Sequence, residues 1–268
     1  MFSSVPGPIG IFDSGYGGLT IFDKIRAAMP GYDYIYLGDN ARSPYGTRSF
    51  EVVYRFTKQA VETLFNEGCQ LVILACNTAS AKALRTIQQR DLPQWDPARR
   101  VLGVIRPTVE LMDKISKSKH VGILGTTGTI TSDSYSLEIK KMFPHMTVTG
   151  EACPMWVPLV ENNEFDSPGA DYFVRKHLEH ILAADPEIDT LVLGCTHYPL
   201  LIEKIKAFLP EGITLFSQGE YVAASLTDYL RRHPEMDILT TESAAKFSDA
   251  ASVFLNHPVE VEQIRLVE

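Results

Sequence analysis

Two cysteines stand at corresponding points of two similar stretches of this 268-residue chain. Cys76 follows the apolar run 71–75, Cys195 follows the run 190–194, and residues with hydroxyl or amide groups come directly after each. Short apolar runs that reach small residues and then a helical pattern predict buried parallel strands. Both thiols are therefore expected at the carboxyl ends of strands, where open α/β sheets bind their ligands.

A pair of thiols that face each other across a cleft suits proton transfer at carbon. A thiolate is a good general base for carbon acids, and a thiol opposite it is a matching acid. One sulfur can remove a proton from one face of a tetrahedral carbon while the other delivers a proton to the opposite face, which inverts the configuration. This chemistry needs neither a metal nor an organic cofactor where preorganised donors stabilise the carbanion-like transition state.

Polar residues expected near the two cysteines are candidates for binding the substrate or for shifting the pKa of the thiols. Hydroxyl and amide donors can hold a carboxylate or an amine, while acidic groups and histidine can shift the pKa of a thiol. The donors are Asn77, Thr78 and Thr196, and the tuning groups are Asp13, Glu161 and His197. Asp13 could equally cap a turn or a helix.

Four strand-like segments, in one order, occur twice along the chain. The first set covers residues 9–13, 34–39, 71–75 and 101–105, and the second covers 121–125, 146–151, 190–194 and 213–217. Helical patterns are expected at 19–29, 51–67, 78–89, 131–143, 172–184, 200–208 and 222–232, a loop or short helix at 157–161, and a last strand near 259–266. The pattern predicts an α/β protein with two similar, open, mostly parallel-sheet domains related by pseudo-two-fold symmetry. We expect domain one at 1–105 plus 220–268, domain two at 106–219, and the active site in the cleft between them.

Composition narrows the class of protein further. A formal net charge of −8, with no basic run, argues against general nucleic-acid binding. The amino-terminal residues lack the features of a signal peptide, and no apolar run approaches the ~18 residues that a membrane span needs. The four cysteines have no CxxC spacing, which favours reduced thiols. We therefore expect a cytoplasmic protein with no membrane association.

Five sequence blocks, taken together and in order, resemble the glutamate racemases of the aspartate/glutamate racemase superfamily over nearly the whole chain. The blocks are Ile11–Thr20, Pro44–Gly46, Ala75–Ala79, Val157–Glu161 and Gly194–Leu200. The resemblance implies cofactor-independent interconversion of L- and D-glutamate, with D-glutamate supplied to peptidoglycan synthesis, and a homodimer is expected. It implies that Cys76 and Cys195 are the acid/base residues. It further implies substrate contacts from Asp13, Ser14, Tyr45, Gly46, Asn77, Thr78, Thr196 and His197, with supporting roles for Asp39 and Glu161.

The chain departs from the family pattern at three places outside the cysteine blocks. Tyr16 replaces a small aliphatic residue, Arg106 stands where an acidic residue is common, and Phe216–Gly219 departs from an Asp-Ser-containing stretch. The absence of a long amino-terminal extension leads us to expect no activation by a peptidoglycan precursor.

Other interpretations stay open at this stage. Cys195 with His197 as its base could serve a thiol hydrolase, although residues two apart on a strand rarely form such a pair. A hinged two-lobed protein could also bind an amino acid without catalysis. Within the racemases, aspartate is the second candidate substrate. The sequence predicts no zinc site at His197 and Cys195, because further ligands at a recognisable spacing are missing. Cys69 and Cys153 are expected to be core residues.

Overall fold

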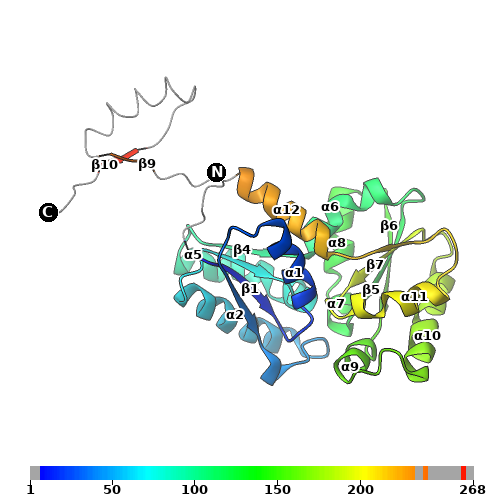
Figure 1. Ribbon diagram of the computed structural model, residues 1–268. Helices are drawn as coiled ribbons and strands as arrows, with labels where there is room; N and C mark the ends of the chain where they lie inside the picture. The colour runs from blue at the N-terminus through cyan, green and yellow to red at the C-terminus, as the bar shows by residue number, and fades with distance from the viewer. Residues whose placement is uncertain (1–6, 233–237, 241–260, 264–268) are drawn as a thin grey trace. The chain divides into compact units, whose positions relative to one another are not determined.

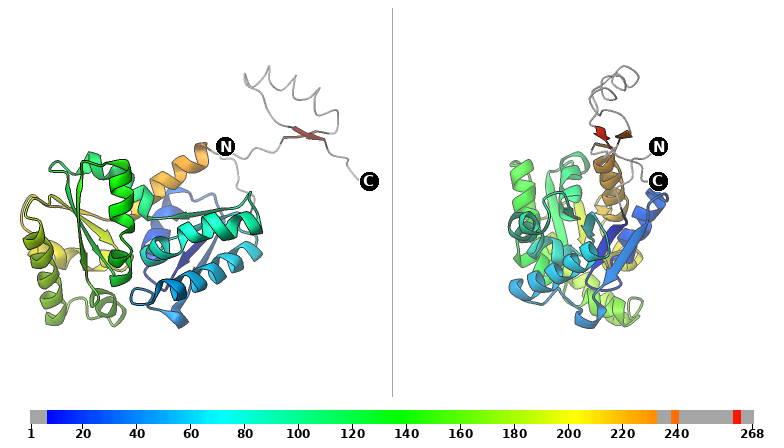
Figure 2. Two further views of the ribbon diagram at one scale, coloured as in Figure 1. Left: turned by 180° about the vertical axis from the view of Figure 1, so that it is seen from behind. Right: turned by 90° about the vertical axis from the view of Figure 1, so that its left-hand side faces the viewer.

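The computed structural model describes residues 7–232, 238–240 and 261–263. The chain divides into two compact units, one of residues 6–229 and one of residues 1–5 with 230–268. The larger unit holds two separate four-stranded parallel sheets with helices on both sides of each, as Figures 1 and 2 show. We call each sheet with its helices a lobe.

The first lobe is built on strands β1 (Ile9–Asp13), β2 (Tyr34–Gly38), β3 (Leu71–Leu74) and β4 (Arg100–Gly103), in the order β2-β1-β3-β4. Every residue of β1 and β3 is buried, because both strands lie inside the sheet and helices cover its faces. Helix α1 (Leu19–Ala28) follows β1, and α2 (Phe50–Asn66) packs on β1, β2 and β3.

The second lobe repeats this arrangement. Its strands β5 (His120–Gly125), β6 (Thr147–Ala152), β7 (Thr190–Gly194) and β8 (Thr214–Phe216) pair in the order β6-β5-β7-β8, all parallel. The first strand of each set lies between the second and the third, so the two lobes have the same topology. This confirms the α/β class and the double occurrence of four strands.

Several helices differ from the expected ranges. The expected helix 78–89 is divided into α3 (Asn77–Lys82), α4 (Leu84–Thr86) and a π-helical turn (Ile87–Asp91), and α5 (Leu92–Trp95), which was not predicted, follows. The expected helix 131–143 is α7 (Thr127–Thr131) and α8 (Ser134–Met142), separated because Asp133 takes a left-handed conformation with φ of 54°.

Helix α6 was not predicted either. The fourth strand was expected to end at Ile105 but ends at Gly103, and α6 (Ile105–Ile115) begins at Ile105. Its buried residues Ile105, Val109 and Met112 recur at helical spacing. The remaining helices are α9 (Trp156–Glu161), α10 (Pro168–Ala184) and α11 (Ile202–Phe208), with 3₁₀ turns at Asn40–Arg42 and Tyr198–Leu201.

The carboxyl-terminal part of the chain is described only in segments. Helix α12 (Gly219–Arg232) begins three residues before its expected start, and Gly219 packs on Lys24 of α1. The last expected strand is described as β10 (Val261–Gln263), which pairs in parallel with β9 (Ile238–Thr240), and its other expected residues lie outside the described part. The domain division at 105 and 220 therefore stays a prediction. No helix in the described segments has the length and hydropathy of a membrane span.

Candidate active site

A pocket lies between the two lobes, at the carboxyl ends of β1 and β3 on one side and of β5 and β7 on the other. Its empty volume is about 600 Å³, with the mouth open to solvent included, which falls in the usual range for small-molecule sites. The residues that line it are Ser14, Ser43, Pro44, Tyr45, Gly46, Thr47, Cys76, Asn77, Thr78, Thr126, Thr127, Pro154, Val157, Pro158, Cys195, Thr196 and His197.

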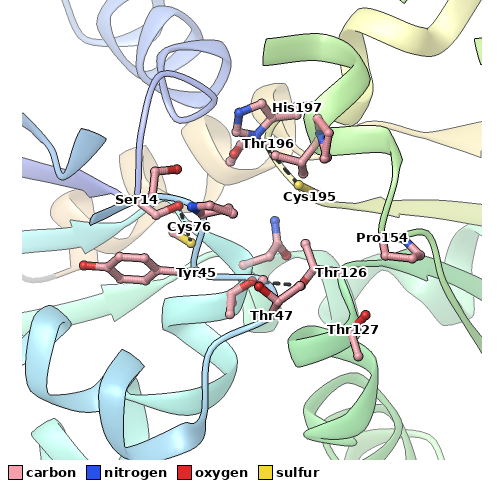
Figure 3. A pocket seen from close by; sticks show the side chains of 17 residues that line it. Ser14, Tyr45, Thr47, Cys76, Thr126, Thr127, Pro154, Cys195, Thr196 and His197 are labelled. Carbon is pink, nitrogen blue, oxygen red and sulfur yellow. Dashed lines mark hydrogen bonds between the residues drawn. The ribbon is translucent and has the colours of Figure 1, made fainter. Parts of the chain in front are cut away.

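The two thiols come from opposite lobes. Figure 3 shows Cys76 on the side of the first lobe and Cys195 on the side of the second, with the pocket between them. Both follow the third strand of their own sheet, so the repeated topology places them at equivalent positions. The two sulfurs are near enough that a negative charge on Cys76 raises the pKa of Cys195.

Cys76 caps the amino terminus of α3. Its Sγ lies 3.4 Å from the backbone N–H of Ala79, which donates to it, and 3.5 Å from Ser14 Oγ. Burial, together with the charge of Asp13, raises the pKa of Cys76 to about 11, and its hydrogen bonds with Ser14 and Ala79 oppose that rise. With this pKa, Cys76 is a neutral thiol near pH 7.

Cys195 has a different polar environment. Burial raises its pKa well above the ordinary thiol value, and the charges of Cys76 and Asp13 add to that rise. His197 Nδ1 lies 3.9 Å from the Sγ, and His197 Nε2 lies 3.1 Å from Glu161 Oε1. In the neutral ring, donation from Nε2 to Glu161 leaves the Nδ1 lone pair facing the thiol.

Asp13 is a buried carboxylate that joins the two lobes behind the pocket. Its Oδ2 accepts from the backbone N–H of Gly15 at 2.9 Å, and its Oδ1 accepts from Thr196 Oγ1 of the other lobe at 3.4 Å. Desolvation raises the pKa of Asp13, and the nearby His197 opposes this. Asp13 is not among the residues that line the pocket, and its contact with the substrate stays a prediction.

Tyr45 and Gly46 line the pocket from the loop after β2. The Tyr45 hydroxyl donates to Asp39 Oδ2 at 2.5 Å, and Arg42 Nε donates to the same oxygen at 2.7 Å. Asp39 itself lies outside the pocket lining, where it fixes the Tyr45 ring. Gly46 accepts from the backbone N–H of Gly128 at 2.7 Å, a direct contact between the lobes at the edge of the pocket.

Asn77 and Thr78 also connect the lobes. Thr78 Oγ1 lies 2.9 Å from Thr126 Oγ1. Asn77 Nδ2 donates to Gln218 Oε1 at 2.7 Å, and Asn77 Oδ1 accepts from the Tyr135 hydroxyl at 2.6 Å. Gln218 in turn donates to Tyr135 at 2.8 Å, which closes a buried polar network where the chain leaves the second lobe.

The structure thus brings nine of the twelve expected residues to the lining of one pocket, and the other three contact lining residues without lining the pocket themselves. The expected residues in the lining are Ser14, Tyr45, Gly46, Cys76, Asn77, Thr78, Cys195, Thr196 and His197, and the three outside it are Asp13, Asp39 and Glu161. Sequence reasoning missed Ser43, Pro44, Thr47, Thr126, Thr127, Pro154, Val157 and Pro158 as lining residues. The duplication contained a signal for Thr126, because it follows the first strand of the second set as Ser14 follows that of the first.

The described residues give Cys195 and His197 no third metal ligand. The one group of three possible ligands within residues 7–232, 238–240 and 261–263 is Glu151, His177 and His180, none of which lines the pocket. The polar groups at the pocket are instead hydroxyls, an amide, thiols and an imidazole, with no arginine or lysine among the lining residues.

Comparison with known proteins shows the relationship. The sequence profile of the Asp/Glu/hydantoin racemases matches residues 16–237. The chain belongs to this racemase family. The glutamate racemase of Roseobacter denitrificans is 40% identical to it, over 94% of this chain and 98% of the relative.

Solved structures agree with this racemase over nearly its whole length. Glutamate racemase isoform RacE1 of Bacillus anthracis matches with a TM-score of 0.78 and 35% identity, over 97% of this chain and 98% of that one. Glutamate racemase from Francisella tularensis, solved in complex with D-glutamate, matches with a TM-score of 0.76 and 31% identity, over 98% and 97% of the two chains. The chain is an amino-acid racemase, an isomerase with two α/β lobes.

Proposed function

We propose that this racemase interconverts L- and D-glutamate, with Cys76 and Cys195 as the two acid/base residues. One observation carries the proposal: a thiol from each lobe lines the same pocket from opposite sides. A planar carbanion-like centre between two such sulfurs can be protonated from either face. Each thiol then acts as base toward one enantiomer and as acid toward the other.

The pocket lining favours glutamate over aspartate as substrate. Named relatives at 36–40% identity are glutamate racemases, and a matching structure holds D-glutamate. The lining residues offer hydroxyl and amide donors, including Ser14, Asn77 and Thr196, and they include no cationic side chain for a short dicarboxylate. Backbone N–H groups at the strand ends add further donors for carboxylates.

Catalysis needs a thiolate, and substrate binding has to favour its formation. Burial keeps both thiols neutral, since it raises the pKa of each. An amino acid carries an ammonium group, and a cation placed within a few ångströms of a thiol favours the charged form. His197, held by Glu161, is placed to share the proton of Cys195. We therefore propose that His197 and Glu161 adjust the pKa of Cys195, and that Ser14 and Asp13 adjust the pKa of Cys76.

The wider setting follows from the same proposal. We assign the enzyme to the cytoplasm, where it supplies D-glutamate for peptidoglycan and thereby supports cell-wall synthesis and cell shape. We expect a homodimer, no membrane or nucleic-acid partner, and activity without pyridoxal phosphate or metal. The two domains, 1–105 with 220–268 and 106–219, are proposed to hinge about the pocket.

Deuterium incorporation in heavy water tests the mechanism. L-Glutamate and D-glutamate are each incubated with dialysed protein, and the α-hydrogen of substrate and product is followed by NMR together with optical rotation. Early product should carry deuterium while remaining substrate does not, because each thiol exchanges its own proton with solvent. Cys76→Ser and Cys195→Ser should each abolish racemisation, whereas Cys69→Ala, at a buried cysteine in the first-lobe core, should retain it.

The exchange experiment, together with a glutamate-binding assay and an ester-hydrolysis assay, separates the alternatives. Full activity in both directions in either serine variant would contradict the two-thiol assignment. Unchanged glutamate binding without α-hydrogen exchange would instead indicate a binding protein, and faster exchange with aspartate would make aspartate the substrate. Burst kinetics with an ester, without exchange, would indicate a thiol hydrolase.

A further inference from the structure

One cluster of potential metal ligands in the second lobe has no part in the racemase site. Glu151 lies near the end of the edge strand β6, and His177 and His180 lie one helical turn apart on α10, which packs on β6. One ligand atom from each of the three residues lies within 4.8 Å of the other two. We propose that Glu151, His177 and His180 form a binding site for a divalent transition-metal ion of the Zn²⁺ type.

The donor set has the chemistry that such ions prefer. Two imidazole nitrogens and one carboxylate oxygen are a common protein ligand set for Zn²⁺, with a water molecule in the fourth position. Mg²⁺ and Ca²⁺ prefer oxygen ligands, so two histidines select against them. Helical i,i+3 spacing puts His177 and His180 on the same face of α10.

The distances require only a small adjustment on metal binding. Glu151 Oε1 lies 2.6 Å from His177 Nδ1 and 3.6 Å from His180 Nδ1. Ligand atoms bonded to Zn²⁺ at about 2.0–2.1 Å in a tetrahedron stand about 3.3 Å apart. The Glu151–His177 pair therefore has to open by less than 1 Å, and the ion would replace the hydrogen bond between them.

Burial gives the site one fixed wall and one open side. His177 is buried and its ring meets the Trp156 ring edge-on at a centroid distance of 6.2 Å. His180 has 58% of its side chain exposed and the Glu151 side chain has 21% exposed. An ion can thus enter from solvent beside His180 without disturbing the core, and His180 can rotate toward it.

Trp156 supplies a direct probe of occupancy. It is one of two tryptophans in the chain, and the other, Trp95, lies in the first lobe. In a Trp95→Phe background, paramagnetic Co²⁺ bound at His177 should quench Trp156 fluorescence in a saturable way at micromolar concentration, and diamagnetic Zn²⁺ should reverse the quenching by competition. The visible absorption of Co²⁺ should show nitrogen and oxygen ligation without a thiolate charge-transfer band.

Two matched variants decide the outcome. His180→Gln changes an exposed ligand and should raise the Co²⁺ concentration for half-quenching at least tenfold. His145→Gln changes an exposed histidine of the same lobe that pairs with Asp113, outside the cluster, and should leave the quenching unchanged. Quenching that does not saturate, that persists in His180→Gln, or that comes with a thiolate charge-transfer band would overturn the proposal.

Discussion

Gly17 brings the first lobe into direct contact with the second beside the pocket. A Cβ atom added at this position would lie 2.4 Å from Thr196 Oγ1 and 2.5 Å from His197 Nδ1. The backbone of Gly17 is not in the left-handed region, so an alanine there meets only a steric obstacle. Gly17→Ala therefore tests how closely the lobes must approach each other for catalysis.

The expected magnitude follows from these contacts. Ordinary van der Waals contacts of a Cβ begin near 3.4 Å, so Thr196 and His197 must move by about 1 Å. Overpacking of this kind costs about 1–3 kcal/mol of unfolding free energy, which lowers the melting temperature by roughly 2–12 °C for a protein of this size. A misplacement of about 1 Å in an active site can reduce the rate by about 100-fold. We expect kcat/KM for racemisation to fall by that order in both directions.

Polarimetry of both enantiomers and a thermal melt measure the two effects. Gly31→Ala is the matched control, because an added Cβ at Gly31 meets no heavy atom within 4 Å and the position lies in the same lobe. The control should keep wild-type activity and stability. If Gly17→Ala also stayed within threefold of the control in kcat/KM, close contact between the Gly17 turn and the His197 loop would not be needed for the reaction.

Three further substitutions test the surroundings of the thiols. Burial raises the pKa of the Cys76 thiol from its ordinary value of 9.0 to about 11 in the folded protein. The neutral thiol therefore contributes its full stabilisation below pH 9, and this stabilisation is lost as the pH rises to about 11. In Cys76→Ser, the free energy of unfolding in urea should fall by about 3 kcal/mol less over this pH range. Tyr135→Phe leaves Asn77 Oδ1 without its donor, which should cost about 1–3 kcal/mol in stability and lower kcat. Glu161→Gln weakens the hold on His197 and should lower kcat/KM about tenfold with little change in melting temperature, since Glu161 is partly exposed.

Each of these has a result that would count against its reasoning. An unchanged slope of stability against pH in Cys76→Ser would mean that other groups cause the alkaline decline. For Tyr135→Phe, wild-type stability would show that water replaces the lost hydroxyl. A Glu161→Gln enzyme that turns over at the wild-type rate would show that His197 is held by its other contacts.

The sequence was enough to predict the strands and the position of both thiols. Apolar runs of four or five residues that end in small residues before a helical pattern predict buried parallel strands, and the residues after such a strand reach the ligand edge of the sheet. Cys76 and Cys195 follow directly from that reasoning. Ser14 lines the pocket and the adjacent Asp13 does not. This difference depends on side-chain direction, which the sequence pattern does not give.

The sequence could not predict the contacts between the lobes, because these contacts join residues that are far apart along the chain. Gln218 bonds to Asn77, which lies 141 positions away, and its environment exists only once both lobes are packed together. The stretch 216–219 stood out only as a departure from the family pattern. Helix α6 was missed because its first residue, Ile105, continues the apolar run of the preceding strand, so periodicity alone could not place the boundary.

Thermodynamics limits what the unlike surroundings of the two thiols can do. Two enantiomers have equal free energy in water, so the ratio of kcat/KM for the two directions of a racemase must equal one whatever surrounds each sulfur. Cys76 has a serine and a carboxylate beside it, and Cys195 has an imidazole. These unlike neighbours can make kcat and KM differ between the two directions, but the ratio kcat/KM must stay the same in both. Any mutation near one sulfur must change the forward and reverse efficiencies by the same factor, even where it changes the two KM values unequally.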